Sequence, residues 1–285
     1  MKFDYTKKRM KIRVLSDNRT LNDSLLSEHG LCVYVETPNY KCLLDTGASD
    51  NFIRNAKQLG IDLTEIDYVF ISHGHADHIG GLEAFLEINS KAKIVMSSQV
   101  LNQEFYSKRN GLHSISIKFD VGLLKDRVVY VDNEACFEDD IQVFKVHKTP
   151  YPLPQGNRTL FKDSGNGLEL DDFDHELIVT FGTEDLVVFT GCGHKGLLNI
   201  LNAITLNVRQ SIRYVLGGFH LLDSTHHTNY ESDLEITELS NYLRTNFPLT
   251  DFITGHCTGE QSYDQMKKVL ESRLRHFFTG YTLEI

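Results

Sequence analysis

The sequence predicts a layered α/β fold built from repeated strand–loop–helix units. The clearest unit begins with the apolar run 68–71, passes through a loop rich in histidine and glycine, and ends in the helix-like run 82–86. Short apolar runs bounded by turn residues are typical of buried strands. Two further units follow the same order, over 186–206 and 251–270. In folds of this class, ligands bind beyond the carboxyl ends of the strands.

The rest of the chain predicts further elements that fit this class. A hairpin is expected where two apolar-rich runs flank Thr37, Pro38 and Asn39. Helical spacing of apolar residues predicts helices over 51–59 and 234–245, and a short helical segment is expected at 25–29. Strands are predicted at 11–15, 31–36, 41–44, 94–96, 128–131, 141–147, 214–221 and 277–285.

The length of 285 residues allows one large domain or two small ones, and we expect a single domain spanning residues 1–285. Hydrophobic residues make up 41% and charged residues 24%, which is ordinary for a globular protein. The region 97–182 is the least regular, and we expect a variable insertion there that shapes the binding pocket. The first thirteen residues carry six basic side chains without the apolar core of a signal peptide, so we expect a cytoplasmic protein.

Charge and hydropathy exclude several partners. The net charge of −10 argues against a nucleic-acid binder. No apolar run reaches the ~20 residues of a membrane-spanning helix, so no membrane partner is expected. The five cysteines include no Cys-x-x-Cys pair, which favours reduced thiols. The sequence does not indicate an oligomeric state.

The loop after the strand at 68–71 concentrates metal-binding side chains. His73, His75, Asp77 and His78 occupy six consecutive positions. Residues two apart in an extended segment point the same way, so His73 and His75 can hold one metal ion, while Asp77 and His78 face a second after the chain turns. Imidazole and carboxylate ligands suit zinc, iron or manganese. A metal ion lowers the pKa of bound water to about 7, which supplies a nucleophile. A solvated histidine-rich loop is the alternative.

Three more predicted strands end in loops that carry histidine, namely His194, His220 and His256. The chain has thirteen histidines, and those at 29, 113, 147, 175 and 276 show no such placement. Repeated placement at strand ends is what a single site built from converging loops requires. For His194 the alternative is a histidine at a helix start. His220 either contacts substrate and transfers a proton, or is a core histidine.

The motif His-x-His-x-Asp-His resembles that of the metallo-β-lactamase superfamily. The resemblance implies a four-layer αββα sandwich with a two-metal site at one edge of the sheets. It implies His194 as the third ligand of the first metal and His256 as the last ligand of the second. It also implies that Asp45, which follows the strand at 41–44, orients the ligand histidines by hydrogen bonding. A simple turn aspartate is the alternative.

One position departs from the superfamily pattern. Many members carry a metal-bridging aspartate where this chain has Cys192, so Cys192 is either a ligand, a neighbour that orients a ligand, or a packing residue. The stretches 191–194, 217–221 and 255–259, together with 17–18 and 28–31, resemble the dihydropteroate-synthase-like branch. That branch includes an archaeal enzyme that joins a dihydropterin to a ribosylated aminobenzene phosphate.

Three functions follow from these features. The first is a metal-dependent hydrolase that acts on an ester, phosphoester or related small-molecule bond, holds two divalent ions with zinc as the first choice, and uses Asp77 or His220 in proton transfer. The second is a pterin-condensing transferase, and the third is a non-catalytic metal-dependent binding protein. An anionic substrate could meet Lys108, Arg109 and Arg158, which otherwise are solvated surface residues.

Overall fold

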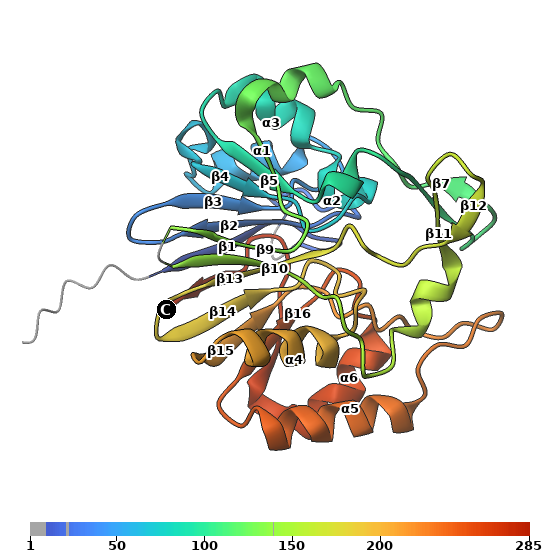
Figure 1. Ribbon diagram of the computed structural model, residues 1–285. Helices are drawn as coiled ribbons and strands as arrows, with labels where there is room; N and C mark the ends of the chain where they lie inside the picture. The colour runs from blue at the N-terminus through green and yellow to red at the C-terminus, as the bar shows by residue number, and fades with distance from the viewer. Residues whose placement is uncertain (1–9, 21–22, 139) are drawn as a thin grey trace, which may run out of the picture.

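The computed structural model describes residues 10–20, 23–138 and 140–285. Its architecture confirms the predicted four-layer αββα sandwich: two seven-stranded sheets face each other, and helices cover the outer face of each (Figure 1). The basic segment used to predict a cytoplasmic location falls mostly on residues 1–9, outside the described residues. Within the described ranges, no helix combines the length and hydrophobicity needed to cross a membrane.

The first sheet is built mainly from the N-terminal half of the chain. Its strand order is β18-β1-β2-β3-β4-β5-β8. The neighbours from β3 to β8 run parallel, whereas β1, β2 and β18 pair antiparallel. The strands are β1 (Lys11–Ser16), β2 (Cys32–Glu36), β3 (Lys41–Leu44), β4 (Tyr68–Phe70), β5 (Lys93–Met96), β8 (Val128–Tyr130) and β18 (Thr282–Glu284).

The second sheet uses the C-terminal half in the order β17-β16-β15-β14-β13-β10-β9. The neighbours from β14 to β17 are parallel, so their carboxyl ends share one edge. The strands are β9 (Glu134–Phe137), β10 (Ile141–Lys145), β13 (Leu177–Phe181), β14 (Asp185–Phe189), β15 (Ser211–Leu216), β16 (Asp251–Thr254) and β17 (Leu274–His276).

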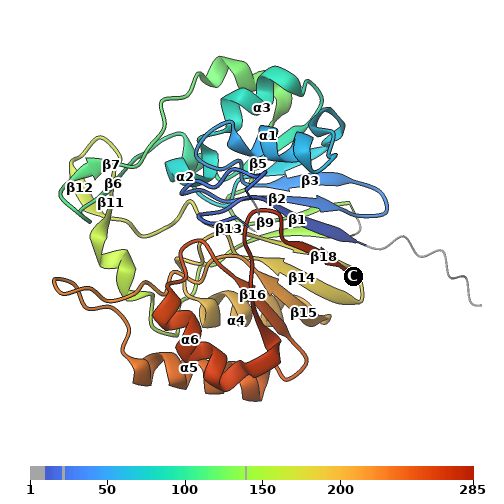
Figure 2. The same ribbon diagram turned by 180° about the vertical axis from the view of Figure 1, so that it is seen from behind.

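The region 97–182 divides between these sheets and a small separate one. Strand β8 extends the first sheet, and β9, β10 and β13 complete the second. The remainder forms a four-stranded antiparallel sheet, which projects to one side of the sandwich (Figures 1 and 2). Its strands are β6 (Glu104–Ser107), β7 (His113–Ser114), β11 (Leu160–Asp163) and β12 (Leu168–Leu170).

Three apolar layers hold the sandwich together. The central layer lies between the sheets, where Phe70 of β4 meets Phe181 of β13 edge to face with ring centroids 6.2 Å apart. The outer layers pack helices onto each sheet, as with Phe52 and Phe85 on the first sheet and Met266 on the second. The helices are α1 (Asn51–Gln58), α2 (Ala76–Ile79), α3 (Leu82–Ile88), α4 (Leu197–Asn207), α5 (Asp233–Asn246) and α6 (Glu260–Leu270).

Three expectations about local structure need correction. The segment 25–29 is not helical; it forms an irregular loop in which the Glu28 carboxylate accepts hydrogen bonds from the backbone N–H groups of Ala48 and Ser49. The strand expected over 214–221 ends at Leu216, because the Gly217–Gly218 pair turns the chain. The strand expected over 277–285 covers only Thr282–Glu284, and the preceding strand β17 was not predicted.

Candidate metal centre

The predicted metal-binding residues converge at one edge of the sandwich. His73 follows β4 in the first sheet, while His194, His220 and His256 follow β14, β15 and β16 in the second. Because β14, β15 and β16 are parallel neighbours, their following loops leave the sheet at the same edge. The convergence of distant loops is therefore a consequence of sheet topology.

One group of three histidines is arranged to hold a metal ion. One ring nitrogen from each of His73, His75 and His194 lies within 4.8 Å of the other two. The Nε2 atoms of His73 and His194 are buried, and neither has a hydrogen-bond partner among the described residues. A buried nitrogen without a partner destabilises a fold by about 1–3 kcal/mol. A divalent ion bound by three imidazoles would satisfy these nitrogens, so the residues fit a metal.

A second group lies beside the first. His78 Nε2 is 3.0 Å from His256 Nε2, and Asp77 Oδ2 is 3.3 Å from His256 Nε2 and 3.7 Å from His78 Nε2. Cys192 Sγ is 3.1 Å from His78 Nε2 and also groups with His73, so it lies between the two sets of donors. Carboxylate, imidazole and thiolate are all zinc ligands, and this set also fits a divalent ion.

In four of these histidines, a neighbouring side chain hydrogen bonds to Nδ1, the ring nitrogen on the other side from Nε2. A partner on Nδ1 fixes the ring and leaves Nε2 directed at the metal position. Asn18 and Asn157 come from loops far away in the sequence. The pairs are His73 Nδ1 with Ser72 Oγ at 2.9 Å, His78 Nδ1 with Asp45 Oδ2 at 2.7 Å, His194 Nδ1 with Asn157 Oδ1 at 3.1 Å and His256 Nδ1 with Asn18 Oδ1 at 3.1 Å.

His75 is supported in a different way, by the region 97–182. Asp171 Oδ2 lies 3.5 Å from His75 Nε2 and 3.1 Å from His175 Nε2. The backbone N–H of Gly74 donates to His175 Nδ1 at 3.0 Å, so the proton of His175 is on Nε2 and points to Asp171. Burial alone would raise the pKa of the Asp171 carboxyl, but the neighbouring His175 and His75 lower it below its ordinary value. Asp171 is therefore ionised and orients His75.

Three residues of the site have left-handed backbone conformations. The φ angles are 61° at Asp45, 50° at His220 and 53° at His256. Such conformations cost non-glycine residues about 1–3 kcal/mol and gather at functional sites. Each of the three residues comes directly after a strand or within four residues of its end. The sharp change of direction aims the side chains across the edge of the sheets.

Burial sets the protonation of the histidines. Burial, reinforced by neighbouring imidazoles, holds the pKa values of His73 and His194 well below their ordinary range. Both rings are therefore neutral, which is the form that binds metal. Burial also opposes a charge on His256, but the hydrogen bond to Asp77 and the negative groups around it raise its pKa to about 9. A metal ion that binds His256 must displace that proton.

A cavity of about 560 Å³ opens over both donor sets. Arg109 lines its wall, where Nε donates to Thr159 Oγ1 at 2.9 Å and Nη2 lies 3.0 Å from His220 Nε2. His29 lines the cavity as well, with Nε2 3.3 Å from Asp77 Oδ2 and its ring stacked on His256. The cavity thus combines a metal-binding floor with a cationic wall.

Comparison with known proteins decides the family. A crystal structure of a metal-dependent hydrolase of the β-lactamase superfamily superimposes with a TM-score of 0.81 at 30% sequence identity, covering 97% of this chain and 99% of that one. The family model of the metallo-beta-lactamase superfamily matches residues 28–158. The chain belongs to the metallo-β-lactamase superfamily.

Two archaeal proteins from Methanocaldococcus jannaschii are similar over nearly their whole length. One is a 7,8-dihydropterin-6-methyl-4-(β-D-ribofuranosyl)-aminobenzene-5'-phosphate synthase, 25% identical over 91% of this chain and 90% of the synthase. The other is an uncharacterised protein, also 25% identical, over 96% of this chain and 98% of the relative. The resemblance to the synthase branch is thereby confirmed. Divalent metal binding follows from membership of the metallo-β-lactamase superfamily.

The structure brings most of the predicted site residues together and moves two away. The predicted metal-binding and proton-transfer residues gather at one cavity, with Asp45 hydrogen bonded to His78 and Arg109 on the cavity wall. These residues are His73, His75, Asp77, His78, Cys192, His194, His220 and His256. Of the three residues predicted to meet an anion, Lys108 and Arg158 do not line this cavity. The ammonium of Lys108 lies 3.8 Å from the centroid of the Phe161 ring, and the guanidinium of Arg158 lies over Tyr230.

Five further residues of the site were not singled out for it by the sequence analysis. They are Asn18, His29, Asn157, Asp171 and His175. Three of them come from the irregular region 97–182, where no strand pattern indicates which side chains point inwards. For Asn18 and His29 a signal existed, since both fall in stretches that carry the resemblance to the branch of the superfamily.

Proposed function

We propose that this protein is a metal-dependent hydrolase that binds two divalent ions, zinc in the first instance, and cleaves an ester, phosphoester or related bond in a small anionic molecule. The observation that carries the proposal is the cavity in which two sets of metal donors face the Arg109 guanidinium. Bound metal ions would supply an activated water molecule and polarise the bond to be cleaved.

The chain's own residues would bind and orient the substrate. Arg109 is the charged group on the cavity wall, and hydrogen bonds to Thr159 Oγ1 and the Gly156 carbonyl hold its guanidinium in place. An anionic group of the substrate would bind at this guanidinium, beside His220. Arg109 donates to His220 Nε2, so the proton of His220 is on Nδ1.

Proton transfer would involve His220 and Asp77. Burial lowers the pKa of His220 below its ordinary value, so its imidazole is neutral near pH 7. Once substrate engages Arg109, His220 Nε2 would be available to accept a proton. Asp77 stays ionised, because the nearby His78 and His256 hold its pKa well below the ordinary range although burial opposes this.

The test is a panel of anionic and neutral substrates, assayed with zinc, manganese and iron. The panel comprises phosphomonoesters, phosphodiesters, carboxylic esters and lactones. We expect the protein to hydrolyse compounds of at least one of these classes. For an anionic substrate, Arg109→Gln should raise KM by about 10- to 100-fold, the effect of removing one charged hydrogen-bonding group. The matched control is Lys108→Gln, which removes a charge outside the cavity. Absence of turnover on the whole panel with every metal would contradict the proposal.

A second candidate is a transferase that condenses a pterin with an amine. The observation that favours it is the similarity to the archaeal synthase across about nine-tenths of both chains. In that reaction the amine displaces phosphate or pyrophosphate from the pterin, and Arg109 would bind the phosphate group of the amine substrate. Mass spectrometry of a reaction with an activated dihydropterin and an aminobenzene ribosyl phosphate distinguishes the two functions. A pterin conjugate supports the transferase, and hydrolysis products alone support the hydrolase.

A further inference from the structure

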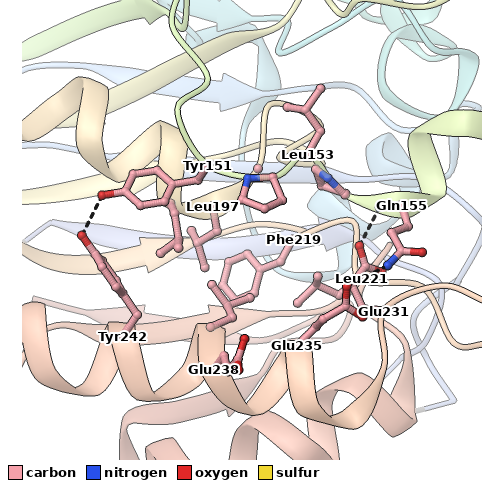
Figure 3. Close-up of a pocket in the computed structure, with 15 residues that line it drawn as sticks. Tyr151, Leu153, Gln155, Leu197, Phe219, Leu221, Glu231, Glu235, Glu238 and Tyr242 are labelled. Carbon is pink, nitrogen blue, oxygen red and sulfur yellow. Dashed lines mark hydrogen bonds between the residues drawn. The ribbon is translucent and has the colours of Figure 1, made fainter.

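A second cavity, of about 330 Å³, lies between the segment 151–155 and the helices α4 and α5 (Figure 3). It shares no lining residue with the first cavity. Phe219 and Leu221, the two neighbours of His220, form part of its wall. None of the residues that line it belongs to the two sets of metal donors.

The walls of this second cavity are apolar. Prolines 152 and 154 with Leu153 cover one side, and leucines from α4 and α5 cover the other. At one end the hydroxyl groups of Tyr151 and Tyr242 hydrogen bond to each other at 2.9 Å, so they do not offer a strong polar group to the interior (Figure 3). A cavity of this size and lining suits a small apolar or aromatic ligand.

The opposite end carries negative charge. The carboxylates of Glu231 and Glu235 lie at this end (Figure 3), and Glu238 also lines the cavity. No lysine, arginine or histidine is among the lining residues that the structure describes. Glu235 is occupied, because its carboxylate caps α5 through Ser232 and accepts from the Gln155 side chain at 3.1 Å. Any charged ligand group at this end should therefore be a cation.

Glu231 is the residue that points to such a ligand. Its Oε1 accepts a hydrogen bond from the Gln155 backbone N–H at 2.6 Å, which fixes the carboxylate against the segment 151–157. Its Oε2 is buried and has no hydrogen-bond partner among the described residues. A buried carboxylate oxygen without a partner is unfavourable, and an ammonium group would satisfy it.

We propose that this cavity is a binding site for a small organic cation with an aromatic or aliphatic body, separate from the metal centre. The apolar body fills the space between Phe219, Leu197 and Leu239, and the cationic group pairs with Glu231. The two cavities share the loop at 219–221, since Phe219 and Leu221 line this cavity and His220 lines the first. Gly196 and Leu197, which line the cavity, follow His194 closely in the chain.

The test compares three probes with one carbon skeleton: 4-phenylbutylamine, the neutral 4-phenylbutanol and the anionic 4-phenylbutyrate. Binding to the metal-loaded protein is measured by calorimetry and by shifts of isotope-labelled tyrosine rings. The amine should bind at least about tenfold more tightly than the alcohol, because a charged hydrogen bond contributes this much. It should also shift the signals of Tyr151 and Tyr242, as identified by their absence in phenylalanine variants.

Variants locate the interaction. Glu231→Gln keeps the shape of the side chain and should reduce the preference for the amine to within about twofold, whereas the control Glu87→Gln on the exposed face of α3 should leave it unchanged. Leu239→Trp fills the cavity and should abolish binding of amine and alcohol alike. The proposal would be overturned if all three probes bound equally, if none of them bound, or if the amine shifted tyrosine signals other than those of residues 151 and 242. The tyrosine shifts test the proposal even if Leu239→Trp does not fold.

Discussion

Asp45 controls the protonation of one histidine in each set of metal donors. Its Oδ2 lies 2.7 Å from His78 Nδ1, so it holds the His78 proton on Nδ1 and leaves Nε2 free to bind a metal. The Ser72 hydroxyl donates to the same oxygen at 2.7 Å and can therefore accept from His73 Nδ1 at 2.9 Å. The Ser72 backbone N–H donates to Oδ1 at 2.7 Å. One buried carboxylate thus directs Nε2 of both His73 and His78 towards the metal positions.

The substitution Asp45→Asn tests this arrangement with almost no change of shape. The remaining oxygen can still accept from the Ser72 N–H, but an NH₂ group then faces His78 Nδ1 and the Ser72 hydroxyl. The proton of His78 moves to Nε2, which prevents metal binding there. Removing such a partner weakens metal affinity by about 10- to 100-fold, and a lost hydrogen bond to a charged group corresponds to about 1.5–3 kcal/mol.

The assay is competition with a chromophoric chelator, followed by elemental analysis of the dialysed protein. Asp45→Asn should lose affinity for both ions, and Ser72→Ala should affect chiefly the ion held by His73. The matched control is Asp50→Asn, since the Asp50 carboxylate is exposed and pairs with Arg54 on the surface. Wild-type affinity for both ions in Asp45→Asn would refute the reasoning that this carboxylate sets the histidine protonation.

Three further predictions concern individual residues. Cys192→Ser should lower the content of one metal ion if the thiolate is a ligand, as its position between the donor sets suggests, and elemental analysis decides this. Burial and the nearby Arg19 lower the pKa of His276 to about 4, so the folded protein should lose stability as the pH falls from about 6.5 towards 4. Because the ring is partly exposed to solvent, we expect a loss of ~1 kcal/mol at pH 5. In urea unfolding, His276→Gln should lose less stability over this pH range than the wild type. Arg158→Gln should leave KM for anionic substrates unchanged in steady-state assays, because its side chain lies over Tyr230.

The sequence was most informative where a predicted metal ligand follows a buried strand. The apolar runs before His73, His194 and His256 indicate both the strand and the edge to which the next residues belong, and the structure places these three histidines together. The four-layer sandwich itself came from the resemblance of the motif, since periodicity does not show how two sheets pack.

The residues that the sequence did not reveal lie in irregular segments. His29 and His175 were grouped with scattered histidines, because neither follows a predicted strand. His29 nevertheless stacks on His256, and His175 holds Asp171 against His75. Lys108 and Arg158 show the reverse case: a positive charge near a predicted pocket does not tell which way a long side chain points. In such segments only the folded backbone determines direction.

The central claim is that two adjacent sets of side chains hold two metal ions at one edge of the sandwich. Anomalous diffraction from zinc-loaded crystals, recorded on both sides of the zinc absorption edge, tests it most directly. The claim predicts two peaks, one at about 2.0–2.1 Å from nitrogens of His73, His75 and His194 and one at similar distances from Asp77, His78 and His256. The claim would be contradicted if the peak were missing from one or both sets, or if zinc bound only elsewhere on the protein.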